Sequence, residues 1–382
     1  LNQELTDKRR ELALSILIDW EQPLKRDPVH GHWWPSQEGN SLLIRNVIDS
    51  MIHPLLEESN PVFQRFAVEL IHQYQLSGYR TNLTELATHS NSPSSLRAAS
   101  LNALDRLDLP FSKQLLHSLL QDNNRAVRLR TMNLFVKRNP TSFLSTFQNV
   151  LLHGSIPARQ DVLLVLSTIE TSEVTSLLKD FLRQLIAGDV SESLVLDILQ
   201  SSTARKREEL QPLLLQYQNT LPADDTLASF LSCLRGGSVE KGRNLFFHNG
   251  EIACSRCHRH QGIGGQIGPD LSTIGERQSR RQLLESLLEP NRQIAKGFES
   301  IVLTTDQGKI LTGILQKEGS GHVDLRTLDG EMIRVPKPLI ESMDRTDSAM
   351  PGNLTDQINV RQIRDLIAFL KASVSPVPSN TR

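Results

Sequence analysis

The chain has 382 residues, of which 38% are hydrophobic and 22% are charged, and its formal net charge at neutral pH is −1. This length allows two or three domains with buried cores. The balanced charge gives no support for binding to nucleic acids or to a membrane surface. No apolar run reaches the roughly 20 residues that a membrane-spanning helix needs.

Residues 1–235 are expected to form helix after helix, and one pattern recurs along them. An arginine followed by small and apolar residues stands at Arg65, Arg97, Arg128 and Arg159, at intervals of 31 or 32 residues. This period fits two short helices and two turns. One such pair cannot bury its apolar stripe alone, so we expect neighbouring pairs to stack into a solenoid. The pattern resembles short HEAT repeats, although the usual HEAT period is about 40.

Two roles fit the aligned arginines. We favour pairing with acidic groups or backbone carbonyls of neighbouring repeats over a binding stripe on the surface. Residues 20–35 interrupt the repeat, because their prolines exclude a regular helix. Within them, the adjacent Trp33 and Trp34 form either an exposed docking surface or a loop packed on the solenoid.

Residues 254–258 carry the clearest chemical signal. Two thiols three positions apart, followed directly by an imidazole, form the attachment pattern of c-type haem. The thiols of Cys254 and Cys257 would add to the two haem vinyl groups, and His258 would bind the iron. The alternatives are zinc, which needs four ligands, and a redox pair of thiols, which needs a βαβ context. We expect the remaining Cys233 to be a small buried hydrophobe.

From Ser238 onward the chain resembles the cytochrome c domain at the C-terminus of large secreted proteins of planctomycetes and verrucomicrobia. The motifs that carry the resemblance are 242–247, 264–271 and 360–370. It implies that Gly242 lets the last helix cross closely and that an aromatic side chain packs near the haem. It also implies that Pro269 offers its carbonyl to the free N–H of His258, which fixes the imidazole ring.

The same resemblance implies the sixth ligand of the iron. Met350, followed by Pro351, resembles the methionine–proline loop of the family, although ordinary cytochromes c reach this methionine sooner than the 92 positions that separate it from His258. We favour Met350 over Met343, which lacks a following proline. The other competing side chains are Met332, His248 and His260. An open or histidine-ligated sixth position remains the alternative.

An inserted β-sheet explains the long spacing before Met350. Strand-like segments lie at 299–305, 309–316, 322–328 and 332–335, and Asp329-Gly330 predicts a hairpin turn between the last two. The expected fold class is therefore mainly α, with a HEAT-like solenoid at 1–235 followed by a class I-type cytochrome c domain at 238–376. The β insertion spans about 299–345 of that domain, and 377–382 form a disordered tail.

The expected function is electron transfer through one covalently bound haem c. Ligation by histidine and methionine fills both axial positions, so the iron changes oxidation state with little rearrangement. The partners would be a dehydrogenase-type donor and an electron acceptor, with the solenoid as docking scaffold. The alternatives are a peroxidase-type enzyme with an open iron position and a haem-based redox or gas sensor. We favour an electron carrier over a catalyst that acts by itself.

The expected location is the periplasm or another compartment outside the cytoplasm, because haem c is attached there. The chain begins with Leu1 and shows no signal peptide. We therefore expect a processed protein or a piece of a longer one, from which a dehydrogenase-like domain could be missing.

Overall fold

The computed structural model describes residues 6–18, 20, 41–109, 112–252 and 254–375. Trp33, Trp34 and the expected tail at 377–382 lie outside these residues. Helices account for 58% of the chain, and a small β region accompanies them, so the mainly α class is confirmed. The chain divides into two compact units, Leu1–Leu166 and Ser167–Arg382. In the part of the chain that is described, no helix has both the length and the apolar character needed to cross a membrane.

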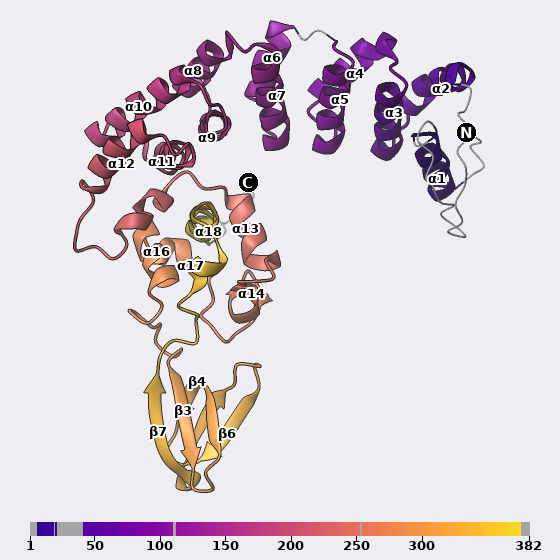
Figure 1. Cartoon of the computed structure of the whole chain (residues 1–382). Coiled ribbons are helices and arrows are strands. Elements are labelled where there is room, and N and C mark those ends of the chain that lie inside the picture. The colour runs from indigo at the N-terminus through magenta and orange to yellow at the C-terminus, as the bar shows by residue number, and fades with distance from the viewer. Residues whose placement is uncertain (1–5, 19, 21–40, 110–111, 253, 376–382) are drawn as a thin grey trace, which may run out of the picture. The chain divides into compact units, whose positions relative to one another are not determined.

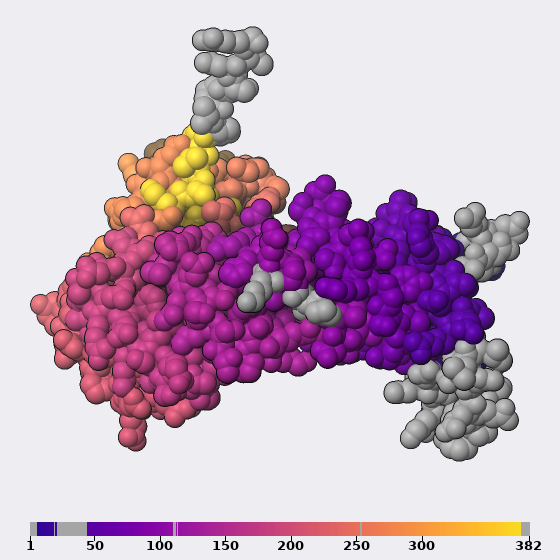
Figure 2. Space-filling model, turned by 90° about the horizontal axis from the view of Figure 1, so that it is seen from above, coloured from indigo at the N-terminus to yellow at the C-terminus, as the bar shows by residue number. Residues whose placement is uncertain are grey.

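The first unit consists of helices that pack in pairs (Figure 1). Each of α2, α4, α6 and α8 packs on the helix that follows it, and α3, α5, α7 and α9 pack on one another in sequence order. In the space-filling view, the colours of this unit follow one another as successive bands (Figure 2). The helices are α1 (Asp7–Ile18), α2 (Ser41–Leu56), α3 (Pro61–Gln73), α4 (Arg80–Thr88), α5 (Ser94–Arg106), α6 (Lys113–Leu120), α7 (Arg125–Arg138), α8 (Phe143–His153) and α9 (Ile156–Leu166).

Polar side chains define where several of these helices begin. Asn60 accepts a hydrogen bond from the backbone N–H of Val62 at the start of α3, where Pro61 occupies the first helical position. Asn124 accepts from two backbone N–H groups at the start of α7. These caps satisfy donors that have no partner within the helix. Capping asparagines therefore mark the points at which these two helices start.

Two of the aligned arginines are buried and connect neighbouring pairs. Arg97 donates to the carbonyl of Ala87 and to the carboxylate of Asp122. Two N–H groups of Arg128 donate to Asp161, at 2.7 and 3.0 Å. The expected pairing is thus confirmed for these two. It is wrong for Arg65, which is exposed and pairs with Glu69 of its own helix.

The second unit begins with further helices and continues into the part with the haem motif. Residues Leu196, Leu227 and Cys233 share one apolar core with Phe246 and Leu366. The expected boundary near residue 236 therefore falls inside this unit. The helices are α10 (Ser172–Ala187), α11 (Val195–Ala204), α12 (Gln211–Gln218), α13 (Val239–His248), α14 (Cys254–Cys257), α15 (Ile274–Arg277), α16 (Arg280–Leu288), α17 (Leu354–Gln357) and α18 (Val360–Ala372).

Helices α13 and α18 cross closely at a glycine. A Cβ atom on Gly242 would lie 2.0 Å from the backbone oxygen of Asp365 and 2.7 Å from the Cβ of Phe369. No side chain can fit there, since real Cβ atoms do not approach backbone so closely. The close crossing expected from the resemblance is confirmed, and Leu366, Phe369 and Leu370 are buried on α18 as its packing face.

A buried ion pair joins α11 to α18. Asp197 is 1% exposed, and its carboxylate accepts a hydrogen bond of 2.6 Å from Arg364. Arg361 lies 3.4 Å from the other carboxylate oxygen. This polar contact adds to the shared apolar core and holds the helical part of the second unit against the last helix.

The inserted sheet has five antiparallel strands in the order β6-β5-β4-β3-β7. Its core contains Ile301, Leu303, Val323 and Leu325. Four strands lie where the sequence predicts them, but the fifth, β7, was not expected. Its alternating pattern is weak because charged and polar residues dominate it, and it forms an edge of the sheet. The strands are β3 (Ser300–Thr305), β4 (Ile310–Glu318), β5 (His322–Arg326), β6 (Met332–Pro336) and β7 (Ile340–Thr346).

Candidate functional site

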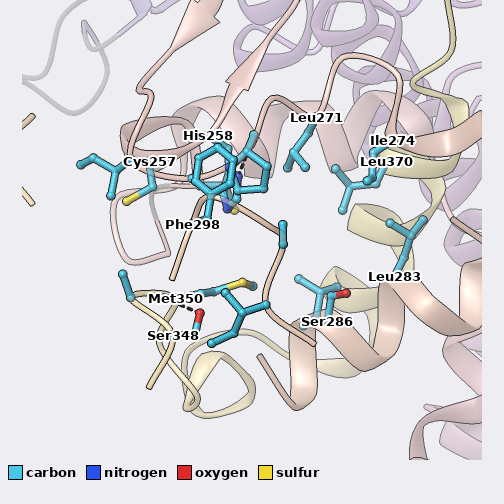
Figure 3. A pocket seen from close by; sticks show the side chains of 18 of the residues that line it. Cys257, His258, Leu271, Ile274, Leu283, Ser286, Phe298, Ser348, Met350 and Leu370 are labelled. Atoms are coloured by element: carbon cyan, nitrogen blue, oxygen red, sulfur yellow. Dashed lines mark hydrogen bonds between the residues drawn. The ribbon is translucent and has the colours of Figure 1, made fainter. Parts of the chain in front are cut away.

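A cavity in the second unit is surrounded by segments far apart in the sequence (Figure 3). The two cysteines of the motif, His258, Pro269 and Met350 all line it. Most other lining residues are apolar, among them Phe246, Ile252, Leu271, Ile274, Leu283, Leu287, Ile294, Phe298, Ile314, Leu354, Leu366 and Leu370. All five site residues predicted from the sequence are therefore brought to one cavity.

Helix α14 places the two thiols on one side of a single helical turn. Cys254 and Cys257 are its first and last residues, and positions three apart share a face of a helix. The turn continues into the imidazole, because the backbone N–H of His258 donates to the carbonyl of Cys254 at 2.9 Å. Burial raises the pKa of Cys254 to about 11 and also raises the pKa of Cys257. Both side chains are thus neutral thiols facing the cavity.

The ring of His258 is fixed by the carbonyl of Pro269, at 2.9 Å from Nδ1. A carbonyl oxygen can only accept, so Nδ1 carries the proton and Nε2 keeps its lone pair. Burial lowers the pKa of His258, although the hydrogen bond to Pro269 opposes this effect. The neutral imidazole, which is the form that binds a metal, is favoured.

Gly268 makes this arrangement possible. A Cβ atom at this position would lie 2.5 Å from Cε1 and 2.7 Å from Nδ1 of His258. The backbone therefore packs directly on the imidazole ring, and its N–H donates to the carbonyl of Cys257 at 2.9 Å. The loop after the motif holds the ring by contact on its face as well as by the hydrogen bond at its edge.

Met350 lies across the cavity from His258 (Figure 3). It is partly buried, and it packs against the apolar core of the second unit. The other methionines considered lie elsewhere, since Met343 is on β7 and Met332 is on β6, and both side chains are exposed. Neither lines the cavity.

The neighbouring histidines are placed differently from His258. His248 is exposed at the end of α13. His260 is buried, its Nε2 lies 2.8 Å from the hydroxyl of Ser373, and its ring packs against Phe369 at 4.8 Å between centroids. Burial lowers the pKa of His260. Its contacts are those of a core side chain, and neither histidine lines the cavity.

Comparison with known proteins agrees with this geometry. Residues 239–308 match the family model for cytochrome c. The second unit contains a cytochrome c domain. No curated protein matches the chain. A cytochrome c domain implies a covalently bound haem c with its iron, and it implies a redox partner.

The residues around the cavity of the cytochrome c domain fit this group. The walls are mostly apolar, as a porphyrin requires. Two neutral thiols and a neutral imidazole with its Nε2 lone pair available face the same space. Among the lining residues that the structure describes, Arg277 is the single charged side chain. Figure 3 shows Cys257 and Ile274, which begins the four-residue helix of Arg277, on opposite sides of the cavity.

Some lining residues were not found by sequence reasoning. Arg277 lies on a helix of four residues, too short to leave a periodic pattern. Phe298 and Ile314 come from the segment before β3 and from β4, so the inserted sheet closes part of the cavity. Only the glycine before Phe298, which has a φ of 83°, indicates a special turn there. Phe298 and Ile314 reach the cavity because the insertion folds onto the helices.

Proposed function

We propose that the cytochrome c domain is an electron-transfer module with His258 and Met350 as axial ligands of the haem iron. When bound, the haem supplies a one-electron carrier whose iron alternates between the ferric and ferrous states. The observation that supports this most directly is the pairing of an oriented imidazole and a thioether on opposite walls of one cavity (Figure 3). Because two protein ligands would occupy the axial positions, substrate binding at the iron is disfavoured.

The chain's own residues divide this work. Cys254 and Cys257 would each form a thioether, which keeps the haem attached in both oxidation states. Pro269 fixes the tautomer and the direction of the His258 ring and raises its basicity as a ligand. The thioether of Met350 is neutral and soft, so it favours ferrous iron and raises the potential.

Arg277 would hold a carboxylate of the haem. The two propionates leave the porphyrin on the edge opposite the vinyl groups, and the helix of Arg277 begins across the cavity from Cys257 (Figure 3). Arg277 donates to the carbonyl of Asp270, the residue after Pro269, at 3.0 Å. The carbonyl of Pro269 would thus orient His258, and the adjacent carbonyl of Asp270 would orient Arg277 toward a propionate.

The helix pairs would form a HEAT-like solenoid that serves as a docking scaffold. Support comes from the row α3, α5, α7 and α9 and from the buried arginines that link successive pairs. The partners would be a dehydrogenase-type donor, acting on sugars or alcohols by resemblance, and an acceptor in the periplasm or another exported location. The resemblance to the planctomycete and verrucomicrobial cytochrome c domain motivates the proposed partners and the proposed location. The boundary near residue 236 stays part of this proposal, since the family match begins at residue 239.

The test is the absorption spectrum of purified protein, with and without carbon monoxide and cyanide. A protein with both axial positions filled shows a long-wavelength sulfur-to-iron band in the ferric state and binds these ligands slowly. Met350→Ala should remove the band and open the iron, whereas Met343→Ala should do neither. Rapid binding of carbon monoxide by the unmutated protein would instead favour the hypothesis of a peroxidase-type enzyme or of a haem-based sensor.

A further inference from the structure

The loop that carries Met350 is attached to the rest of the domain by side-chain hydrogen bonds. The loop runs from the end of β7 at Thr346 to the start of α17 at Leu354. Asn291 accepts a hydrogen bond of 2.8 Å from the backbone N–H of Ser348. The hydroxyl of Ser348 in turn accepts one of 3.2 Å from the backbone N–H of Met350 (Figure 3). A chain of two bonds therefore connects Asn291 to the backbone of the methionine.

Few other polar contacts hold this loop. Among the described residues, no backbone–backbone hydrogen bond outside the helices and strands involves 347–352. The neighbouring Pro351 has no N–H to donate, and Pro351 and Gly352 are exposed. The position of the Met350 backbone thus depends on the Asn291–Ser348 link together with the partly buried methionine side chain.

Asn291 lies in the turn that follows α16. It follows the buried Pro290 in a turn closed by a bond from the N–H of Arg292 to the carbonyl of Glu289, at 3.0 Å. The guanidinium of Arg292 pairs with Glu285 on α16, at 2.8 Å. Two other residues of α16, Leu283 and Leu287, line the cavity. The link therefore ties the methionine loop to the turn after α16, although Asn291 and Ser348 are 57 positions apart in the chain.

We propose that Asn291 is a positioning residue for the sixth ligand, which holds the Met350 loop within bonding reach of the iron. The inference rests on the proposed function, because it assumes that Met350 binds the iron. With the link intact, the thioether stays on the iron and excludes outside ligands. With the link broken, the loop samples open positions and the iron accepts outside ligands more often.

The test compares three variants of the full-length holoprotein, with imidazole as the probe ligand. Asn291→Leu keeps the size of the side chain but removes the acceptor, and Asn291→Asp keeps an acceptor oxygen. Asn353→Leu is the matched control, since Asn353 is exposed three positions after Met350 and its side chain makes no capping bond. The measurements are the apparent affinity of the ferric iron for imidazole and the intensity of the sulfur-to-iron band.

We expect Asn291→Leu to bind imidazole about three to ten times more tightly, as the loss of one hydrogen bond predicts, and to weaken the band. Asn291→Asp and Asn353→Leu should remain close to the unmutated protein. Ser348→Ala, which breaks the second bond of the chain, should act in the same direction and serves as a second variant if Asn291→Leu folds poorly. Unchanged affinity in both Asn291→Leu and Ser348→Ala would overturn the proposal.

Met350→Ala separates this outcome from a failure of the proposed function. If Met350→Ala opens the iron but the Asn291 and Ser348 variants do not, the ligand assignment stands and the positioning role is wrong. If Met350→Ala leaves imidazole binding unchanged, Met350 is not the ligand, and the role of Asn291 is excluded with it. An equal effect of Asn353→Leu would also exclude a specific role for Asn291.

Discussion

The helix pairs of the first unit and the cavity of the second unit use buried polar groups in opposite ways. In the helix pairs, charged side chains face each other in the interior, as Arg128 does with Asp161, both about 4% exposed or less. The cavity is lined mostly by apolar groups, and its partly buried imidazole is satisfied by a backbone carbonyl rather than by a charge. The helix pairs of the first unit contain buried ion pairs, whereas Arg277 is the single charged side chain among the described residues that line the cavity.

The difference follows from what each interior has to hold. A buried ion pair contributes little net stability but allows few alternative partners, so it can fix which helix packs on which. A haem cavity has to accommodate a large apolar ring, and fixed charges beside the iron would shift its potential. Neutral hydrogen-bond donors and acceptors orient the iron ligand without placing a fixed charge beside the iron.

The largest expected effect concerns the thiols, which have no counterpart in the helix pairs. Replacement of both Cys254 and Cys257 by alanine should abolish covalent haem attachment, because no thioether can form. Haem staining of a denaturing gel and extraction with acid–acetone measure this. Cys233→Ala is the control, since that thiol is buried and donates to the carbonyl of Val360. Haem that stays attached in the double variant would contradict the assignment.

The second prediction tests whether the cytochrome c domain has a boundary near residue 236, inside the second unit. A chain that begins at Ser238 lacks Leu196, Leu227 and Cys233, which belong to the core around α18. It should still bind haem, but its unfolding free energy should be lower by about 5 kcal/mol than that of a chain beginning at Ser167. Chemical denaturation followed by haem absorption measures the difference. Equal stability would place an independent cytochrome boundary at residue 236.

The third prediction tests the ion pairs of the first unit. Asp161→Asn leaves Arg128 buried without a full charge partner, and it weakens a second contact with Arg125 at 2.8 Å. Loss of one member of a buried pair should cost about 3–5 kcal/mol. Circular dichroism during urea unfolding should register this loss, whereas the haem spectrum and potential should not change. A stability change below about 1 kcal/mol would mean that Arg128 finds compensation from the carbonyls of Asp122 and Asn123.

The sequence predicts these two regions with different success for a physical reason. The repeat of Arg97 and Arg128 is visible in the spacing, which predicts the helix pairs, whereas the expected arginine pairing holds for these two but not for Arg65. The haem motif is local as well, since Cys254, Cys257 and His258 lie within one turn. The attachment part of the site was therefore accessible from five residues.

The remainder of the site depends on contacts that no spacing reveals. Phe298 and Ile314 reach the cavity only because the insertion folds against the helices, and Asn291 meets Ser348 across 57 positions. The boundary near residue 236 was inferred from the end of the repeat, but the core that includes Cys233 runs across it. Sequence patterns identify elements, whereas the pairing of distant loops is decided by their packing.

The smallest expected effect concerns Arg277, the charge at the edge of the cavity. Arg277→Gln removes a positive charge beside the haem, which stabilises the more positive ferric state, so the potential should fall. Solvent screens the charge of this exposed side chain, so we expect the potential to shift by only about 20–50 mV. A propionate that loses its cation should also titrate at higher pH, and the potential should then fall as pH rises through that range.

Arg256→Gln is the control, because Arg256 is exposed on α14 but does not line the cavity. The haem potential of the Arg256→Gln variant should shift without a new pH dependence. Identical behaviour of the two variants would mean that Arg277 acts only as a general surface charge.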